Sequence, residues 1–142
     1  MNRVFLDTDV ILDFYIRREP HHSVALRLFT YLKKTKVPCF TSALVVANAY
    51  YILSKLKTAT YALDKARRLR RLVSVAPLTE AVVDSALNAP NRDFEDTIQL
   101  QCALQNGIGT LITRNTKDYP KERVKIIDPL QYLSAAALTK KG

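Results

Sequence analysis

The feature that most constrains this chain is a repeated alternation of short apolar segments with longer amphipathic ones. The short segments are apolar throughout, which is typical of strands buried on both faces of a parallel sheet. We expect strands at 3–6, 37–40, 73–76, 109–113 and 124–127. We expect helices between and after them, at 10–17, 22–34, 42–56, 60–72, 79–87, 94–105 and from Pro129 onward. The pattern predicts an α/β fold in which helices cover both faces of a central parallel sheet.

Length and local signals indicate one domain. The 142 residues are enough to bury a hydrophobic core without disulfides or structural metals. Ser42 and Thr79 are expected to cap helices, and Thr8 or Asp9 is expected to cap the first one. A polar loop is expected at 88–93. We expect a single domain over 1–137, followed by a short tail at 138–142.

The charge balance favours a polyanionic partner. Lys and Arg number 22 against 13 Asp and Glu, for a net charge of +9. Such an excess is typical of proteins that bind nucleic acid, although it also serves solubility. Cys39 and Cys102 are too far apart in sequence to suggest a zinc site. We find no apolar run of membrane-spanning length and no signal peptide, and therefore expect a cytoplasmic protein with no membrane partner.

Acidic side chains follow several of the predicted strands. In parallel sheets, functional side chains gather at the carboxyl ends of the strands, where separate loops converge. Three segments could bring carboxylates or amides to that edge, and their polar residues are Asp7, Asp9, Asp13, Asp93, Asp96, Asn115 and Asp118. Individually, each has an ordinary structural explanation as a turn or cap residue, and capping is the stronger explanation for Asp9 and Asp93. Their convergence favours a functional site.

Oxygen ligands without His or Cys select Mg²⁺ or Mn²⁺. Clustered carboxylates repel one another unless a cation compensates them. One or two such ions could activate water against a phosphodiester, which is the chemistry of a metal-dependent nuclease. A basic amphipathic helix at 60–72 carries Arg68 and Arg71, for which a solvated face and an RNA or protein contact are both open.

Three segments together resemble the PIN-domain family, in particular its VapC-like toxin ribonucleases. They are Val4-Phe5-Leu6-Asp7-Thr8-Asp9, Asp93-Phe94-Glu95-Asp96-Thr97-Ile98-Gln99 and Leu111-Ile112-Thr113-Arg114-Asn115-Thr116-Lys117-Asp118-Tyr119. They occur in the family's order and extend over nearly the whole chain. The resemblance implies a Rossmann-like three-layer α/β/α fold, Mg²⁺- or Mn²⁺-dependent RNA cleavage and a homodimer. It also implies a cognate antitoxin that would cover the site.

The resemblance implies roles for individual residues. Asp7, Asp96 and Asp118 correspond to catalytic, metal-binding carboxylates, with Asn48 and Asp93 as further metal ligands. Supporting residues are expected to be Thr8, Thr113, Asn115 and Asp13. RNA phosphates are expected to be held by Arg114, Lys117, Arg68 and Arg71.

One position departs from the family pattern. The helix after the second strand has Asn48 where the family places a glutamate, so this site would carry one negative charge less. Two alternatives follow. The chain could be a weakened or inactive PIN domain that binds RNA or a protein, or, because Asp7-Thr8-Asp9 resembles a nucleophile-and-acid pair, a haloacid-dehalogenase-like phosphatase. The motif at 113–118 has no place in such a phosphatase, which therefore ranks last.

Overall fold

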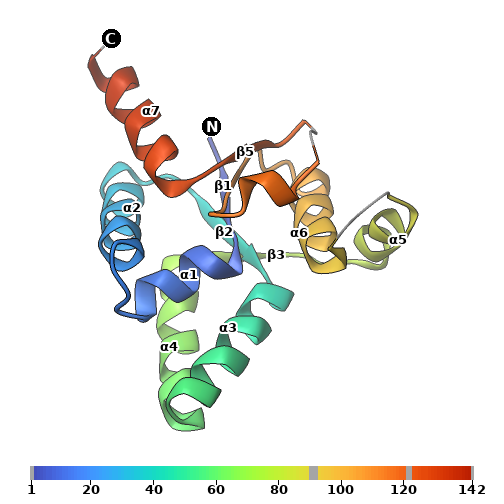
Figure 1. Ribbon diagram of the computed structural model, residues 1–142. Coiled ribbons are helices and arrows are strands. Elements are labelled where there is room, and N and C mark those ends of the chain that lie inside the picture. The colour runs from blue at the N-terminus through green and yellow to red at the C-terminus, as the bar shows by residue number, and fades with distance from the viewer. Residues whose placement is uncertain (1, 90–92, 121–122, 142) are drawn as a thin grey trace.

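Five strands form one sheet in which every neighbouring pair is parallel. The computed structural model describes residues 2–89, 93–120 and 123–141. The sheet has the order β3-β2-β1-β4-β5 (Figure 1). Its strands are β1 (Val4–Leu6), β2 (Cys39–Ser42), β3 (Ser74–Ala76), β4 (Thr110–Ile112) and β5 (Lys125–Ile127). The predicted parallel α/β sheet is confirmed.

Helices cover both faces of the sheet and produce three layers (Figure 1). One layer contains α1 (Thr8–Tyr15), α2 (His21–Thr35), α3 (Ala43–Leu56) and α4 (Ala59–Leu72), in which α1 contacts α2 and α3, and α3 contacts α4. α7 (Pro129–Lys141) packs against α2. The other layer contains α5 (Glu80–Asn88) and α6 (Phe94–Gln105). A short 3-10 helix, η1 (Thr116–Asp118), connects β4 to β5.

The core lies on both sides of the central strands. Side chains of β1 and β4, such as Phe5, Leu6, Leu111 and Ile112, are fully buried. As predicted, Ser42 Oγ accepts a hydrogen bond from the Val45 N–H, which caps α3. Of the helices in the described part of the chain, none is long and apolar enough to cross a membrane.

Several boundaries differ from the expected ones. The cap of α1 is Asp7 rather than Thr8 or Asp9, because Asp7 has an extended backbone and its Oδ1 accepts from the Thr8 N–H at 2.7 Å. β2 is shifted by two residues, since its pairing with β1 begins at Cys39, directly after Pro38. α7 continues through Lys141, into the segment expected as a tail. Residues 90–92 of the expected polar loop lie outside the described residues.

Candidate active site

A cavity of about 390 Å³ opens at the carboxyl ends of the central strands. It is reached by residues that follow β1 and β4 and by side chains of α3 and α6. Its described lining contains no Lys, Arg or His. Its acidic lining residues are Asp7, Asp9, Asp93, Glu95, Asp96 and Asp118. We call this feature the acidic cavity; it brings together all three predicted carboxylates, together with Asn48, Asp93, Thr8 and Asn115.

Asp7 is the most strongly held of these carboxylates. It is buried between the end of β1 and the start of α1. Its Oδ2 accepts from the Thr113 hydroxyl at 2.9 Å and from the Tyr119 hydroxyl at 2.8 Å. Thr113 follows β4 and thus supports Asp7, as predicted, whereas Tyr119 was in the quoted motif without an assigned role. The neutral donors orient Asp7 without neutralising its charge.

Asp96 lies in the first turn of α6, across the cavity from β1. The helix begins at Asp93, whose Oδ1 accepts from the Asp96 N–H at 3.2 Å, so Asp93 is a cap as well as a lining residue. The Tyr119 hydroxyl lies 3.4 Å from Asp96 Oδ1 and 2.8 Å from Asp7 Oδ2. Because a tyrosine has one proton to donate, the shorter contact to Asp7 takes precedence.

The pKa values in the acidic cavity report crowding of negative charge. Burial, followed by the charges of Asp7, Asp93 and Asp118, raises the pKa of Asp96 to about 7. Burial also raises the pKa of Asp7, with a contribution from the charge of Glu95, against the hydrogen bonds it accepts. A cation placed among these groups would favour their charged forms.

Asp9 is a residue whose importance the sequence did not reveal. Its Oδ2 accepts from the Arg114 N–H at 2.9 Å and lies 3.3 Å from the Thr113 hydroxyl. Its Oδ1 is buried and has no hydrogen-bond partner among the residues that the structure describes. Burial, followed by the charge of Asp7, raises the pKa of Asp9 to about 6. Asp9 therefore belongs to the cavity instead of capping α1.

Helices α3 and α6 meet along one wall of the cavity. The Asn48 amide on α3 donates a short hydrogen bond to Glu95 Oε1 on α6. The hydroxyl of Ser42, the cap of α3, donates to the Oε1 of Gln99, one turn after Glu95, at 2.6 Å. Glu95 and Gln99 were not among the predicted site residues, although Gln99 follows Asp96 by three positions and Glu95 by four, spacings that place side chains on one face of a helix.

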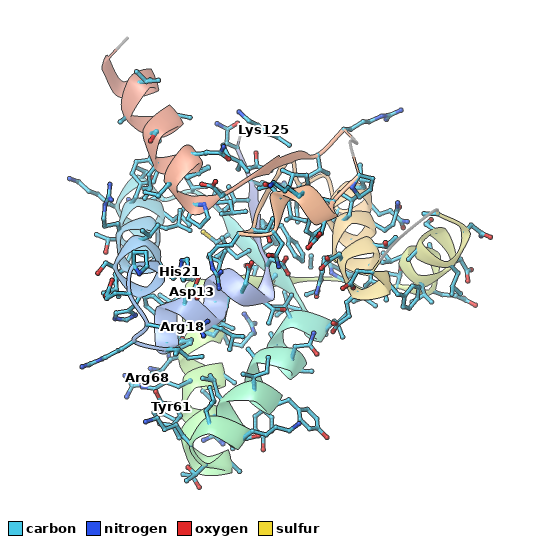
Figure 2. The ribbon with its side chains drawn as sticks, viewed as in Figure 1. Asp13, Arg18, His21, Tyr61, Arg68 and Lys125 are labelled. Atoms are coloured by element: carbon cyan, nitrogen blue, oxygen red, sulfur yellow. The ribbon has the colours of Figure 1, made fainter. Side chains whose placement is uncertain are left out.

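Asp13 and Arg114 are two predicted site residues that the structure does not bring to the acidic cavity. They pair with each other, with Arg114 Nε 2.6 Å from Asp13 Oδ2 and Nη2 3.2 Å from Oδ1. Both line a separate cavity, with His21, which is labelled beside Asp13 in Figure 2. The predicted RNA contact through Arg114 is thus not supported, because the guanidinium is engaged. Asp13 supports the cavity indirectly. It holds the side chain of Arg114, and the backbone N–H of Arg114 donates to Asp9, which lines the cavity.

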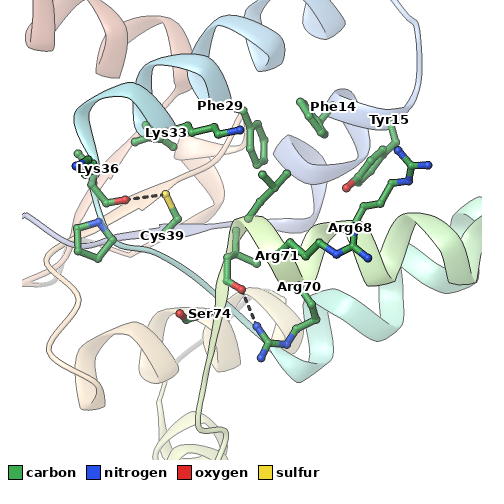
Figure 3. Close-up of a pocket in the computed structure, with 15 residues that line it drawn as sticks. Phe14, Tyr15, Phe29, Lys33, Lys36, Cys39, Arg68, Arg70, Arg71 and Ser74 are labelled. Atoms are coloured by element: carbon green, nitrogen blue, oxygen red, sulfur yellow. Dashed lines mark hydrogen bonds between the residues drawn. The ribbon is translucent and has the colours of Figure 1, made fainter.

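Arg68 and Arg71 also lie away from the acidic cavity. With Lys33, Lys36 and Arg70 they surround a cavity of about 710 Å³ between α2 and α4 (Figure 3), which we call the basic groove. The groove adjoins the segments that enter β2 and β3, so it lies at the opposite ends of the strands from the acidic cavity. Among the predicted phosphate contacts, Lys117 is exposed on η1, next to Asp118, which lines the acidic cavity.

The acidic cavity fits a divalent cation in donor type and in charge. Its donors are carboxylate and amide oxygens, the ligands of Mg²⁺ and Mn²⁺. Asp9 Oδ1, which has no hydrogen-bond partner among the described residues, and the raised pKa of Asp96 both indicate negative charge that is incompletely compensated. In residues 2–89, 93–120 and 123–141, no group of three or more His, Cys, Asp or Glu side chains is arranged so that it could hold an ion. The acidic cavity therefore suits a divalent cation in the type of its donor atoms and in its negative charge.

A family model for the PIN domain matches residues 3–117. Ribonuclease VapC1 from Aquifex aeolicus (strain VF5) is 26% identical over 130 residues, which cover 88% of this chain and 89% of that protein.

Two solved structures share the fold. VapC20 from Mycobacterium tuberculosis, described as a Sarcin-Ricin loop cleaving toxin, aligns with a TM-score of 0.61 and 21% identity over 76% of this chain and 86% of that one. VapBC2 from Rickettsia felis, bound to a DNA fragment from its promoter, aligns with a TM-score of 0.68 and 16% identity over 88% of this chain and 97% of that one. These similarities agree with the three-layer fold described above.

Proposed function

This chain belongs to the PIN-domain family, and from that premise we propose that it is a metal-dependent endoribonuclease, the toxin of a toxin–antitoxin pair. The observation that carries the proposal is the acidic cavity, which gathers six acidic side chains and no described basic one at the carboxyl ends of the strands. The 26% identity to a ribonuclease supports the reaction and the substrate class.

Asp7, Asp96 and Asp118 are the residues that would hold Mg²⁺ or Mn²⁺, with Asn48 and Asp93 beside them. A bound ion would supply activation of water and neutralisation of the charge on the leaving oxygen. Thr113 and Tyr119 keep Asp7 oriented through their hydroxyls. Burial of Asp7 keeps bulk water from competing for its oxygens. Hydrolysis then adds the elements of water across one P–O bond of the RNA.

The charge distribution suits an RNA substrate. The chain has a net charge of +9 although six acidic side chains line the acidic cavity, so the protein as a whole attracts a polyanion while the cavity repels it unless a cation is present. Lys117 is placed to contact a phosphate near the cavity. Because phosphate contacts carry no sequence information, the RNA sequence that is cleaved does not follow from them. An RNA substrate also implies a cytoplasmic location.

We infer two protein partners. A cognate antitoxin is supported by the similarity to VapBC2, and it would act by covering the acidic cavity, with an Arg or Lys placed among the carboxylates. The basic groove, remote from the cavity, suits a contact with such a partner better than a contact with the RNA being cleaved. A homodimer is supported by apolar side chains exposed on α3, where Tyr51 is 65% and Leu56 58% exposed.

The alternatives predict different results. An inactive PIN domain would bind RNA or a partner without cleaving, and the absence of a carboxylate at Asn48 favours it. The phosphatase alternative is set aside, because the chain belongs to the PIN-domain family and the segment 113–118 contributes to the acidic cavity.

The proposal is tested by incubating the chain with a mixed RNA pool while Mg²⁺ or Mn²⁺ is titrated. We expect metal-dependent cleavage in the wild type and a loss on the order of a hundredfold or more in Asp7→Asn and Asp96→Asn, because each removes a charge that the ion requires. Asp84→Asn, on exposed α5, is the matched control and should cleave normally. Folded wild-type protein that cleaves at no metal concentration would establish the inactive alternative.

A further inference from the structure

Asn48 on α3 stands where the PIN-domain pattern has a glutamate, and it contacts Glu95 on α6. Position 48 lies on the wall of the acidic cavity, where an asparagine offers an amide oxygen but no negative charge. Its amide N–H is directed at Glu95 Oε1, and the two side chains come from different helices, 47 positions apart in the sequence. Asn48 therefore restrains the carboxylate of Glu95 at the place where its own side chain ends.

Among the residues that the structure describes, Asn48 is the only hydrogen-bond partner of the Glu95 side chain. It lies in the first turn of α6, but the cap of that helix is Asp93, so α6 does not need Glu95 for its N-terminal N–H groups. No Lys, Arg or His in the described ranges forms an ion pair with it. An exposed glutamate side chain without a partner samples many rotamers. The hydrogen bond from Asn48 holds the Glu95 carboxylate in one position at the cavity wall.

Glu95 adds a negative charge to the wall of the acidic cavity. The Glu95 side chain lines the same cavity as Asp7, the most buried acidic residue of the site. Glu95 and Asp96 are adjacent, so α6 presents two carboxylates to the cavity while α3 presents an amide. The number of negative charges around the cavity is maintained, although one of them originates from a different helix.

We propose that Glu95 is a metal-holding residue of this site and that Asn48 is a positioning residue that aims the Glu95 carboxylate into the acidic cavity. This proposal rests on the proposed metal-dependent function. It assigns the asparagine on α3 a role through hydrogen bonding, so the departure from the family pattern does not imply loss of activity. The carboxylate on α6 supplies the charge instead.

The primary readout is the affinity of the full chain for Mn²⁺ alone, measured by titration with electron paramagnetic resonance of the free ion. Glu95→Gln keeps an acceptor for the Asn48 amide but removes the charge. We expect it to weaken Mn²⁺ binding on the order of tenfold, since ligand charge sets the affinity of such sites. Glu80→Gln is the matched control, because Glu80 occupies the first turn of α5, outside the cavity, and it should bind Mn²⁺ like the wild type.

Three further variants separate positioning from charge. Asn48→Ala should weaken Mn²⁺ binding by no more than Glu95→Gln does, and the double variant should be no weaker than Glu95→Gln alone, because Asn48 acts through Glu95. Asn48→Glu combined with Glu95→Gln moves the carboxylate to α3 and should restore the affinity. A general loss of structure would not be reversed in this way, and urea unfolding of each metal-free variant verifies the fold.

The outcomes distinguish this inference from the proposed function. If Asp96→Asn abolishes Mn²⁺ binding while Glu95→Gln leaves it unchanged, the site is a metal site and the role of Glu95 is refuted. Additive losses in the double variant would refute the positioning role of Asn48. If the folded wild type binds no Mn²⁺, the metal-dependent function itself fails, and the inference fails with it.

Discussion

Asp7 and Asp13 show how two buried carboxylates on one short helix acquire different roles. Asp7 accepts hydrogen bonds from neutral hydroxyls, and its pKa is raised because burial is not balanced by a nearby cation. Asp13 instead receives two contacts from the Arg114 guanidinium. At the level of single residues, the charge available for chemistry is therefore the one that the protein leaves without a cationic partner.

The Asp13–Arg114 pair yields a prediction of unequal costs. Arg114→Met leaves the Asp13 carboxylate, whose side chain is 6% exposed, without a cation, which should lower the free energy of unfolding by about 3 kcal/mol. Asp13→Asn leaves a guanidinium that is 30% exposed and reaches water, which should cost about 1 kcal/mol. Urea unfolding at neutral pH measures both. Equal losses in the two variants would show that the pair is not held as the geometry indicates.

At the scale of elements, Ser42 couples two helices from opposite layers. Its hydroxyl accepts from the Val45 N–H at the start of α3 and donates to Gln99 Oε1 on α6, and both side chains are buried. Thr79 caps α5 in the same way but is exposed, and no contact to another helix is associated with its cap. Both residues are typical helix caps in the sequence, but the Ser42 side chain also connects α3 to α6, whereas the Thr79 cap acts within α5.

This difference predicts a larger effect at Ser42 than at Thr79. Thr79→Ala should destabilise the protein by about 1 kcal/mol, the usual cost of a lost cap. Ser42→Ala also leaves Gln99 Oε1 buried without its donor, so we expect a total of about 2–4 kcal/mol. Thermal or urea unfolding of the two variants provides the comparison. A Ser42→Ala variant no less stable than Thr79→Ala would show that the Gln99 contact contributes nothing.

The elements were largely predictable because their signals are local. Apolar runs identified the five strands, and Ser42 and Thr79 marked the starts of α3 and α5 where the structure has them. The start of α1 was wrong because the strand leads directly into the helix and Asp7 serves both. The side-chain pairings Asp13–Arg114 and Asn48–Glu95 were not predictable, since they depend on how each helix is rotated against its neighbours.

At the scale of the whole molecule, opposite charges are separated by the sheet topology. The carboxyl ends of parallel strands meet at one edge, so the sequence positions of Asp7, Asp96 and Asp118 sufficed to predict that they converge. The placement of the basic groove at the other strand ends was not predictable, because it depends on how α2 and α4 pack together. The basic helix face was visible in the sequence, but not its distance from the acidic residues.

The crowded cavity predicts an unusual dependence of stability on pH. The pKa values of Asp9 and Asp96 are about 6 and about 7 in the folded protein, above the ordinary value of 3.8, so the folded state binds protons more tightly than the unfolded chain. The resulting stabilisation is complete below the ordinary value and is lost as pH rises through the folded pKa values. For the metal-free protein, we therefore expect the free energy of unfolding to fall between about pH 4 and pH 7.

Urea unfolding across that pH range, repeated on Asp96→Asn and on the exposed control Asp84→Asn, isolates the cause. Asp96→Asn removes the group with the highest of these carboxylate pKa values, so its stability should fall less steeply and exceed that of the wild type at the upper end of the range, while Asp84→Asn should follow the wild type. Saturating Mg²⁺ should also flatten the wild-type profile, because a cation that binds the ionised carboxylates stabilises the folded state increasingly as pH rises. Parallel profiles for wild type and Asp96→Asn would mean that the carboxylates are not destabilised by one another, and the electrostatic basis for a cation in this cavity would be lost.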